Sequence, residues 1–294
     1  MQLALTGATG FVGRHVIRLA VRRGYEVVAF TRDPSRPVGH CIETRAFSTE
    51  APPDLNGCGA VIHLAGENIM GIWTRGKMRR IRESRVLGTR RIAEAIRASA
   101  KPPDILVSAS AVGFYGDGGE AELTEESPHG TGFLADTCRA WEGEALARES
   151  YCRVIRARLG IVFGKHGGAL RMMLPAFRLG LGARLGSGRQ WLSWIHAEDL
   201  ASLLLFAVEN LDVCGALNAT APWPVRNAEF TRTLARSVRR PAFLSVPAFA
   251  LRLLLRDFSG ELLGSKRVLP AAATAHGFGY RFPELAPALA DIVT

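Results

Sequence analysis

The sequence of 294 residues lacks an apolar run as long as the ~18–20 residues that a membrane-spanning helix needs. Its most apolar stretches, 200–208 and 247–255, are too short, and Arg252 interrupts the second. Residues 1–5 lead directly into a glycine-rich turn with no basic leader and no cleavage site, so we expect no signal peptide. We therefore predict a cytoplasmic protein without a membrane partner.

Paired cysteines are also missing. The five cysteines are odd in number, scattered and free of any C-x-x-C spacing: Cys41, Cys58, Cys138, Cys152 and Cys214. This pattern indicates neither a disulfide framework nor a zinc site. We expect no metal site and a reducing compartment, where unpaired thiols persist.

Lysine is scarce although the formal net charge is +10, because all but four of the basic residues are arginines. A basic chain can bind nucleic acid, but these arginines are spread along expected helices and lack the interleaved aromatic side chains of a base-stacking surface. A solvated basic surface that also favours anionic ligands is the simpler interpretation. We predict no nucleic-acid partner.

Short β-rich apolar runs alternate with longer helical patterns through the first half of the sequence. The expected strands are 2–6, 26–31, 60–64, 104–109 and 153–159, and the expected helices are 12–23, 76–98 and 133–149. Such alternation is typical of βαβ units around a parallel sheet. The predicted fold class is α/β, a Rossmann doubly wound parallel sheet with a smaller, interleaved C-terminal substrate lobe.

The pattern changes near Gly164, after which glycine becomes frequent. Helices are expected at 169–179 and 196–209, and a further strand at 216–219. Asn227 is a candidate N-cap and Pro247 a candidate first-turn residue of later helices. We predict a Rossmann domain at 1–164, with 194–221 returning to it, and a substrate-side lobe formed by 165–193 and 222–294.

A glycine-rich loop follows the first expected strand. Gly7 permits a tight turn, Gly10 lets the backbone approach a diphosphate, and Gly13 allows the next helix to pack closely against the sheet. The N–H groups that open this helix, together with its dipole, favour phosphate. In the context of a strand and a helix the loop predicts a dinucleotide site, whereas alone it would indicate only a flexible turn.

The end of the second strand addresses the choice of cofactor. An NAD site usually carries an acid there, whereas this strand ends in Thr31 and Arg32, which suit the 2′-phosphate of NADP; Asp33 comes one residue later. Arg85, in the helix after the third strand, is either a second phosphate contact or a solvated arginine of a basic helix face.

Several segments resemble those of extended short-chain dehydrogenases/reductases: the loop 7–13, His63-Leu64-Ala65-Gly66 after the third strand, and 108–116 after the fourth. Others narrow the resemblance to the "epimerase family protein" subgroup, sometimes labelled nucleoside-diphosphate-sugar epimerases: 64–69, 126–128, 167–170, 177–196, 218–222, 227–230 and 264–270. The resemblance covers nearly the whole chain. It implies a Rossmann fold with a small C-terminal lobe and bound NADP(H).

The resemblance also implies which residues bind the cofactor. Along the dinucleotide they are Gly7, Thr9, Gly10, Phe11 and Val12 at the diphosphate, Thr31 and Arg32 at the ribose phosphate, His63, Leu64, Ala65 and Gly66 beside the adenosine, Arg85 nearby, and Ile161 on the nicotinamide side. For His63, a satisfied core histidine is an equally good interpretation.

One family feature is missing. Short-chain dehydrogenases normally use a Tyr-x-x-x-Lys pair for proton transfer. None of the four tyrosines here has a lysine four residues later, and the expected helix carries Leu134 and Cys138, or Phe133 and Thr137, at the corresponding positions. This departure argues against ordinary carbonyl reduction and sugar epimerisation.

Three side chains could replace the missing acid. Ser110 matches the family's active-site serine approximately, or only caps the end of a strand. Tyr115 is the only tyrosine near the expected nicotinamide edge. Cys138 would need a lowered pKa to donate a proton, and a buried cysteine is more often a small apolar residue. We name Ser110 and Tyr115 as the candidate catalytic residues.

Substrate contacts are expected at two places. Glu67 and Asn68 follow the third strand at the edge of the sheet where ligands bind, although they could merely close a turn. Arg189, Gln190 and Trp191 precede the segment that returns to the Rossmann domain and are the expected substrate wall.

Two functions follow from these observations. The first is an NADP(H)-dependent oxidoreductase or nucleotide-sugar epimerase without the usual dyad, acting on an unknown small molecule. The second is a non-catalytic NADPH-binding sensor or partner-binding module. The resemblance further implies a homodimer mediated by helices.

Overall fold

A seven-stranded parallel sheet forms the centre of the computed structural model, which describes residues 1–147, 149–165 and 167–294. In spatial order the strands are β13 (Gly215–Ala219), β7 (Arg153–Leu159), β5 (Ile105–Ala111), β4 (Cys58–His63), β1 (Gln2–Thr6), β2 (Glu26–Thr31) and β3 (Glu43–Ala46). The order reverses between β1 and β4, which creates the crevice where open α/β sheets bind ligands. The predicted Rossmann fold class is confirmed.

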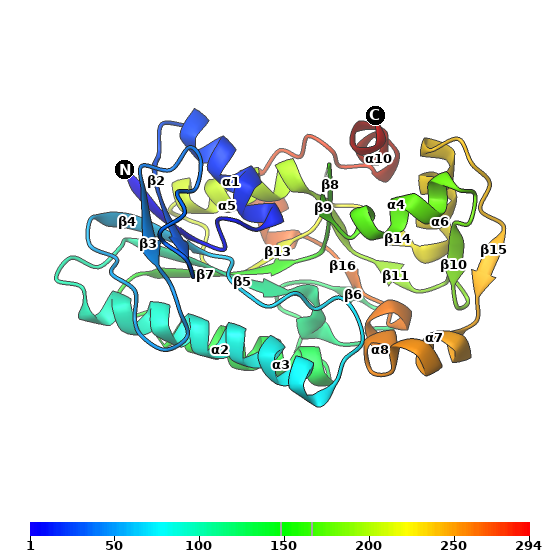
Figure 1. Cartoon of the computed structure of the whole chain (residues 1–294), viewed down its shortest axis with the longest axis horizontal. Helices are drawn as coiled ribbons and strands as arrows, with labels where there is room; N and C mark the ends of the chain where they lie inside the picture. Colours follow the sequence, from blue (N-terminus) through cyan, green and yellow to red (C-terminus); the bar gives the residue numbers. More distant parts are fainter. Residues whose placement is uncertain (148, 166) are drawn as a thin grey trace.

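Helices cover both faces of this sheet (Figure 1). On one face, α1 (Phe11–Arg22) packs beside α5 (Ala197–Glu209), and on the other α2 (Arg75–Ala98) packs beside α3 (Phe133–Leu146). The two cores follow the pleat of the strands: Leu3 and Leu5 face α1 and α5, whereas Ala4 faces the side of α2. Strands buried on both faces explain the continuous apolar runs in the sequence.

The expected elements of the Rossmann part form with small shifts at their ends. The bounds of β1, β2 and β7 are as expected, and the other expected strands end within two residues of the prediction. The expected helix 133–149 ends at Leu146, and residue 148 of that range lies outside the described residues. Strand β3 was missed because its four residues, Glu43–Ala46, are half-exposed at the sheet edge and contain no apolar run.

The rest of the chain forms short helices and small sheets beside the carboxyl edge of the main sheet. The helices are η1 (Val112–Tyr115), α4 (Leu170–Arg178), α6 (Asn227–Ser237), α7 (Ala248–Leu255), α8 (Phe258–Leu263), α9 (Ala271–Ala275) and α10 (Leu285–Val293). The paired strands are β10 (Ala183–Leu185) with β15 (Leu244–Val246), β11 (Trp191–Leu192) with β14 (Val225–Arg226), β6 (Glu122–Leu123) with β16 (Arg267–Val268), and β12 (Trp194–His196) with β8 (Ile161–Gly164) and β9 (Gly167–Gly168). Stacked rings of Phe163, Trp194 and Phe230 lie in the core between them.

Two expected caps are corrected. Arg226, not Asn227, is the N-cap of α6; Asn227 is its first residue, and its side-chain oxygen accepts a hydrogen bond from the Leu185 N–H. Pro247 is the N-cap of α7 instead of a first-turn residue. The sequence places each helix start within one residue, but a side chain that reaches a distant strand cannot be distinguished there from one that caps its own helix.

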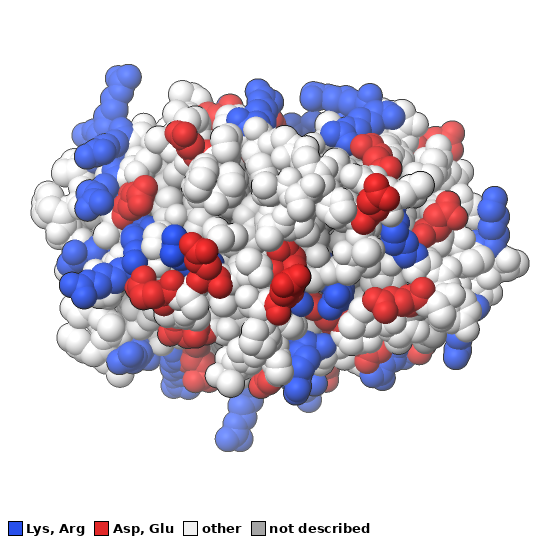
Figure 2. All heavy atoms as spheres, turned by 180° about the vertical axis from the view of Figure 1, so that it is seen from behind, with Lys and Arg blue, Asp and Glu red and all other residues white. Residues whose placement is uncertain are grey.

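Charges of both signs occur together on the surface. On the face opposite to that of Figure 1, acidic and basic side chains are interspersed, without a continuous basic stripe (Figure 2). In the part of the chain that the structure describes, no helix combines the length and the apolarity that crossing a bilayer requires.

Candidate functional site

The glycine-rich loop connects β1 to α1 and leaves no room for side chains. Gly7 has a φ of +70°, and a Cβ there would lie 2.9 Å from the backbone carbon of Leu64. A Cβ on Gly13 would lie 2.3 Å from the Gly7 carbonyl oxygen. Gly10 caps α1 without a side-chain acceptor, so the first N–H groups of the helix are free for an anionic ligand.

Phe11 occupies a slot lined by glycines of the second half of the chain. A Cβ on Gly164, Gly167 or Gly168 would approach the Phe11 ring to between 2.0 and 3.0 Å. Sequence reasoning assigned Phe11 to the diphosphate loop but did not find this slot. The sequence shows that glycine is frequent near Gly164, but this frequency does not reveal which side chain the glycines make room for.

A hydroxyl at the end of β1 fixes the loop that follows β4. Thr6 Oγ1 accepts hydrogen bonds from the N–H groups of Leu64 and Ala65, both at 3.1 Å, and therefore donates its proton to His63 Nδ1 at 2.7 Å. His63 is fully buried, and burial lowers its pKa to about 3, so the ring is neutral. Thr6 is a functional residue that the sequence did not reveal, because its partner lies in another strand.

The end of β2 presents a cation to solvent. Arg32 is exposed beyond Thr31, whose hydroxyl oxygen is buried without a hydrogen-bond partner. The neighbouring Asp33 is engaged elsewhere: its carboxylate accepts from Ser35 Oγ at 2.5 Å and pairs with Arg36 at 3.1 Å. Asp33, the acid that left the choice between NAD and NADP open, therefore binds residues of its own turn.

Arg85 points inward from α2 and is not the solvated arginine of the alternative interpretation. Its Nη1 donates to the carbonyl oxygens of Glu67 and Ile81, and its guanidinium carbon lies 5.2 Å from the centre of the Trp141 ring. The same carbon lies 3.3 Å from the position of a Cβ on Gly66. Arg85 therefore borders the loop after β4.

The two acidic or amide side chains of that loop are already engaged. Glu67 pairs with Lys77 at 2.9 Å, and this hydrogen bond holds the pKa of Glu67 below its usual value. Asn68 Oδ1 accepts from the Met70 N–H at 2.9 Å and closes a turn. An ionised Glu67 is unsuited to act as a general acid at neutral pH.

A buried polar network lies at the carboxyl ends of β5 and β7. Ser110 Oγ donates to Glu142 Oε1 at 2.7 Å, and Arg158 donates to both Glu142 oxygens at 2.9 Å. The Tyr115 hydroxyl accepts from Arg158 at 2.8 Å and donates to Asn218 Oδ1 at 2.7 Å. Ser110 is 2% and Tyr115 3% exposed, so both candidate hydroxyls are buried and have internal partners.

The positions of the missing dyad carry no substitute acid. Leu134 and Cys138 are buried on α3, and burial raises the pKa of the Cys138 thiol to about 12. A thiol in this state is inert as an acid near pH 7. Cys138 is the small buried residue of the alternative interpretation.

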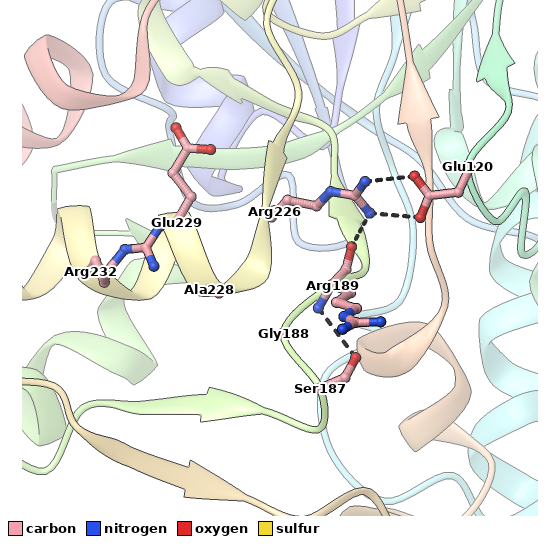
Figure 3. Close-up of a pocket in the computed structure, with 8 residues that line it drawn as sticks. All are labelled: Glu120, Ser187, Gly188, Arg189, Arg226, Ala228, Glu229 and Arg232. Atoms are coloured by element: carbon pink, nitrogen blue, oxygen red, sulfur yellow. Dashed lines mark hydrogen bonds and ion pairs between the residues drawn. The ribbon is translucent and has the colours of Figure 1, made fainter.

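The expected substrate wall is only partly exposed. Gln190 is buried and donates to the carbonyl oxygens of Leu185 and Leu262. The guanidinium carbons of Arg226 and Arg267 lie 4.0 and 4.9 Å from the centre of the Trp191 ring. Arg189 is exposed and borders a cavity of about 460 Å³ near the start of α6 (Figure 3). The cavity is lined by Glu120, Ser187, Gly188, Arg189, Arg226, Ala228, Glu229 and Arg232.

Within this cavity the charges are partly neutralised. Arg226 forms a bidentate pair with Glu120, whereas the side chains of Arg189 and Arg232 are drawn without a partner among the labelled residues (Figure 3). In the described part of the chain, no group of three or more His, Cys, Asp or Glu side chains could hold a metal ion.

Comparison with known proteins identifies the family. The model of the NAD dependent epimerase/dehydratase family matches residues 3–218, and that of a domain of unknown function, DUF1731, matches 246–292. The chloroplastic epimerase family protein SDR39U1 homolog of Arabidopsis thaliana is 37% identical over all of this chain and 87% of its own length.

Two solved structures share both sequence and fold with this chain. The crystal structure of human epimerase family protein SDR39U1 with NADPH is 35% identical, has a TM-score of 0.93, and is matched over 99% of each chain. A nucleoside-diphosphate sugar epimerase from Corynebacterium glutamicum is 32% identical with a TM-score of 0.80, over 99% of this chain and 57% of that one. The resemblance drawn from the sequence is confirmed, and the chain belongs to the NAD dependent epimerase/dehydratase family.

Proposed function

We propose that this chain binds NADPH across the crevice between β1 and β4. The observation that carries the proposal is the close backbone approach at Gly7, Gly10 and Gly13, where added Cβ atoms would collide with backbone atoms and where α1 begins without a side-chain cap. Gly7, Thr9, Gly10, Phe11 and Val12 would hold the diphosphate. The human relative crystallised with NADPH supports this assignment.

The phosphorylated cofactor is favoured by the charges at the end of β2. Arg32 would bind the ribose 2′-phosphate beside Thr31, and Asp33 does not oppose it because Ser35 and Arg36 engage its carboxylate. Along the rest of the crevice, His63, Leu64, Ala65 and Gly66 would lie beside the adenosine. Arg85 would contact the cofactor next to Gly66, and Ile161 would face the nicotinamide.

For the activity we propose an oxidoreductase or epimerase that works without Tyr-x-x-x-Lys. Bound nicotinamide can accept or supply a hydride. Ser110 is the candidate proton donor nearest to the carboxyl end of β5, and the Glu142 carboxylate, which accepts its hydrogen bond, would hold the hydroxyl in place. The family name and the sugar epimerase from Corynebacterium support a nucleotide sugar as the substrate class.

A second candidate function, NADPH binding without turnover, is favoured by a specific observation. Ser110 and Tyr115 both direct their hydroxyl protons at internal acceptors, Glu142 and Asn218, and Cys138 has a raised pKa. A protein in which every candidate acid is committed to the fold could still bind the cofactor as a sensor or a partner-binding module.

One set of measurements separates the two functions. Calorimetry on protein freed of bound nucleotide should detect binding of NADPH and weaker binding of NADH. Nicotinamide absorbance with carbonyl substrates, and product analysis with nucleotide sugars, should then reveal turnover that is lost in Ser110→Ala. Binding without turnover of either kind would select the second function, and no binding of either nucleotide would refute both.

Two other expectations stay predictions. One relative is chloroplastic, so membership of the family does not imply a cytoplasmic location for this chain. The homodimer mediated by helices, which the resemblance implies, also stays a prediction.

A further inference from the structure

Large apolar side chains are exposed together at one end of the molecule. Those at least 39% exposed on β10, β15, α7 and the turns beside them are Leu179, Leu181, Phe243, Leu244, Phe249, Leu253 and Leu254. Strand β15 pairs with β10 and leads through Pro247 into α7, and Arg240 Nε donates to the Arg178 carbonyl oxygen at 3.0 Å, which joins the turns. We call this surface the apolar end; it lies at the right in Figure 1.

The apolar end is basic as well as apolar. The segments 171–189 and 230–256 that build most of it contain ten arginines and no Asp or Glu, and the nearest acids along the chain are Glu229 and Asp257. The ten are Arg171, Arg178, Arg184, Arg189, Arg232, Arg236, Arg239, Arg240, Arg252 and Arg256. Among the described residues, none of these ten forms a salt bridge. Elsewhere arginines are paired closely, as in Arg226 with Glu120 and Arg281 with Glu198, both at 2.6 Å.

A small hollow in this surface places guanidinium groups beside apolar side chains. Its volume is about 250 Å³, and it is lined by Arg184, Ala228, Thr231, Arg232, Ala242, Phe243 and Leu244. Arginine matches the geometry of phosphate oxygens and is weakly hydrated, so two arginines at one hollow suit a phosphate group. The adjoining Phe243 and Leu244 suit the hydrocarbon that is attached to a phosphate in a phospholipid.

We propose that the apolar end docks on the surface of an anionic lipid bilayer, with Arg184 and Arg232 holding a lipid phosphate and α7 lying in the headgroup region. On α7, Leu251 is buried within the protein, whereas Phe249 and Leu253, one helical turn apart, face outward. Arg252 and Arg256 flank them. Apolar residues beside arginine on a short helix are typical of helices that enter only the boundary between headgroups and acyl chains.

This proposal departs from our expectation of no membrane partner, which rested only on the absence of a membrane-spanning helix. The absence of a long apolar run excludes a membrane-spanning helix, but it leaves surface docking open. A second copy of the chain is a poorer occupant of the apolar end. A two-fold interface places the same patch on both subunits, which would oppose arginines to arginines with no acid between them.

Vesicle flotation tests the proposal with the full chain. Vesicles of phosphatidylcholine mixed with phosphatidylglycerol should carry the protein, vesicles of phosphatidylcholine alone should not, and high salt should release it because exposed charges are screened. Failure to float with the anionic vesicles at low salt, or equal flotation with both lipid compositions, would overturn the proposal.

Substitutions then assign the binding to the apolar end. Arg184→Gln with Arg232→Gln should lower partitioning on the order of twentyfold, since each basic residue near an anionic surface contributes roughly fivefold. Phe249→Ser with Leu253→Ser should lower it on the order of tenfold. The matched controls are Arg82→Gln with Arg97→Gln on α2, and the exposed Leu211→Ser; both should float like the wild type.

The variants also separate the alternatives. All of the substituted side chains are exposed, so the thermal unfolding temperatures should stay at the wild-type value. Equal loss of flotation in the α2 control would indicate a non-specific effect of charge and refute the assignment. Light scattering that detects a dimer abolished by Phe249→Ser with Leu253→Ser would assign the apolar end to a second copy instead.

Discussion

Single polar side chains at the ends of parallel strands organise the crevice of this protein. Thr6 connects β1 with the loop after β4 through three hydrogen bonds, and it does so because His63 is neutral and accepts the Thr6 proton. A protonated ring could not accept this bond. The Thr6–His63 hydrogen bond therefore predicts that the free energy of unfolding depends on the protonation of His63.

We expect stability to fall in acid because of His63. Its pKa is about 3 in the folded protein against 6.5 for a histidine in water, so its contribution is complete well above pH 6.5 and is lost as the pH falls through 6.5 toward 3. Between pH 6.5 and 5 this loss amounts to about 2 kcal/mol of unfolding free energy. Urea unfolding across this range should show a correspondingly shallower pH dependence for His63→Gln, whereas the exposed His276→Gln should keep the wild-type slope.

Arg32 is expected to set the preference between the two cofactors. Arg32→Glu should weaken NADPH binding by at least about tenfold to a hundredfold, because it removes a charge-assisted hydrogen bond and adds an acid that repels the 2′-phosphate. NADH binding should stay the same or tighten, because an acid at this position can bind the ribose 2′-OH. Calorimetry with both nucleotides measures the ratio. The exposed Arg97→Glu on α2 is the control, and equal weakening of NADPH and NADH binding would show that Arg32 does not contact the 2′-phosphate.

Residue-scale contacts divide into those that a sequence can predict and those that it cannot. The glycine loop is predictable because its three glycines act on neighbouring backbone. The bond from Ser110 to Glu142 spans 32 residues and that from Tyr115 to Asn218 spans 103, so only the fold brings their atoms together. The sequence therefore pointed to Ser110 and Tyr115 without revealing that both are buried.

At the scale of elements, α1 contains a glycine, Gly13, that disfavours a helix but is required by the close contact with the loop before it. Gly13→Ala would place a Cβ 2.3 Å from the Gly7 carbonyl oxygen, which belongs to backbone that cannot move freely. We expect a loss of about 1–3 kcal/mol in unfolding free energy, together with weaker NADPH binding. The matched control is Gly143→Ala on α3, where a Cβ meets nothing within 4 Å; it should stabilise by about 0.5–1 kcal/mol. Thermal unfolding of both variants that gave the same sign would contradict this account.

Helix α3 is joined to the sheet by buried charges, which predicts a non-additive mutant cycle. Removing either Glu142 or Arg158 leaves the other charge buried, so Glu142→Leu and Arg158→Leu should each destabilise by about 3–5 kcal/mol. The double variant should be less destabilised than the sum of the two, because both buried charges are gone and only the partly exposed Arg156 loses a partner. Strict additivity in urea unfolding would mean that the two side chains do not interact.

Helices and strands were predictable from the sequence when the pattern that forms them lies within the element itself, and not when they depend on a distant partner strand. Strands β1 and β2 are short, nearly continuous apolar runs, and α2 has a long helical period, so the signal for each is present within its own sequence. The two-residue strands β11 and β14 exist only because Trp191 pairs with Arg226 and Leu192 with Val225, far apart in the sequence. A pattern of two residues does not distinguish a strand from a turn. The same holds for β3, which forms a strand because the backbone of β2 is available for pairing at the edge of the sheet.

At the scale of the whole molecule, the chain passes repeatedly between the main sheet and the small helices and sheets beside it. This interleaving predicts how the chain unfolds. Strand β8 pairs with β12, β13 completes the main sheet after the segment 165–193, and α5 packs on α1. Because neither part is continuous in sequence, we expect one cooperative unfolding transition instead of two. NADPH at a hundred times its dissociation constant should stabilise the folded chain by about 2.7 kcal/mol and raise the midpoint of that single transition by roughly 4–5 °C. Calorimetric scans with and without NADPH check both points, with Gly13→Ala as the variant whose shift should shrink. Two transitions of which only one moves with NADPH would show that the small helices and sheets beside the main sheet fold independently of it, and the interleaving would then carry no energetic coupling.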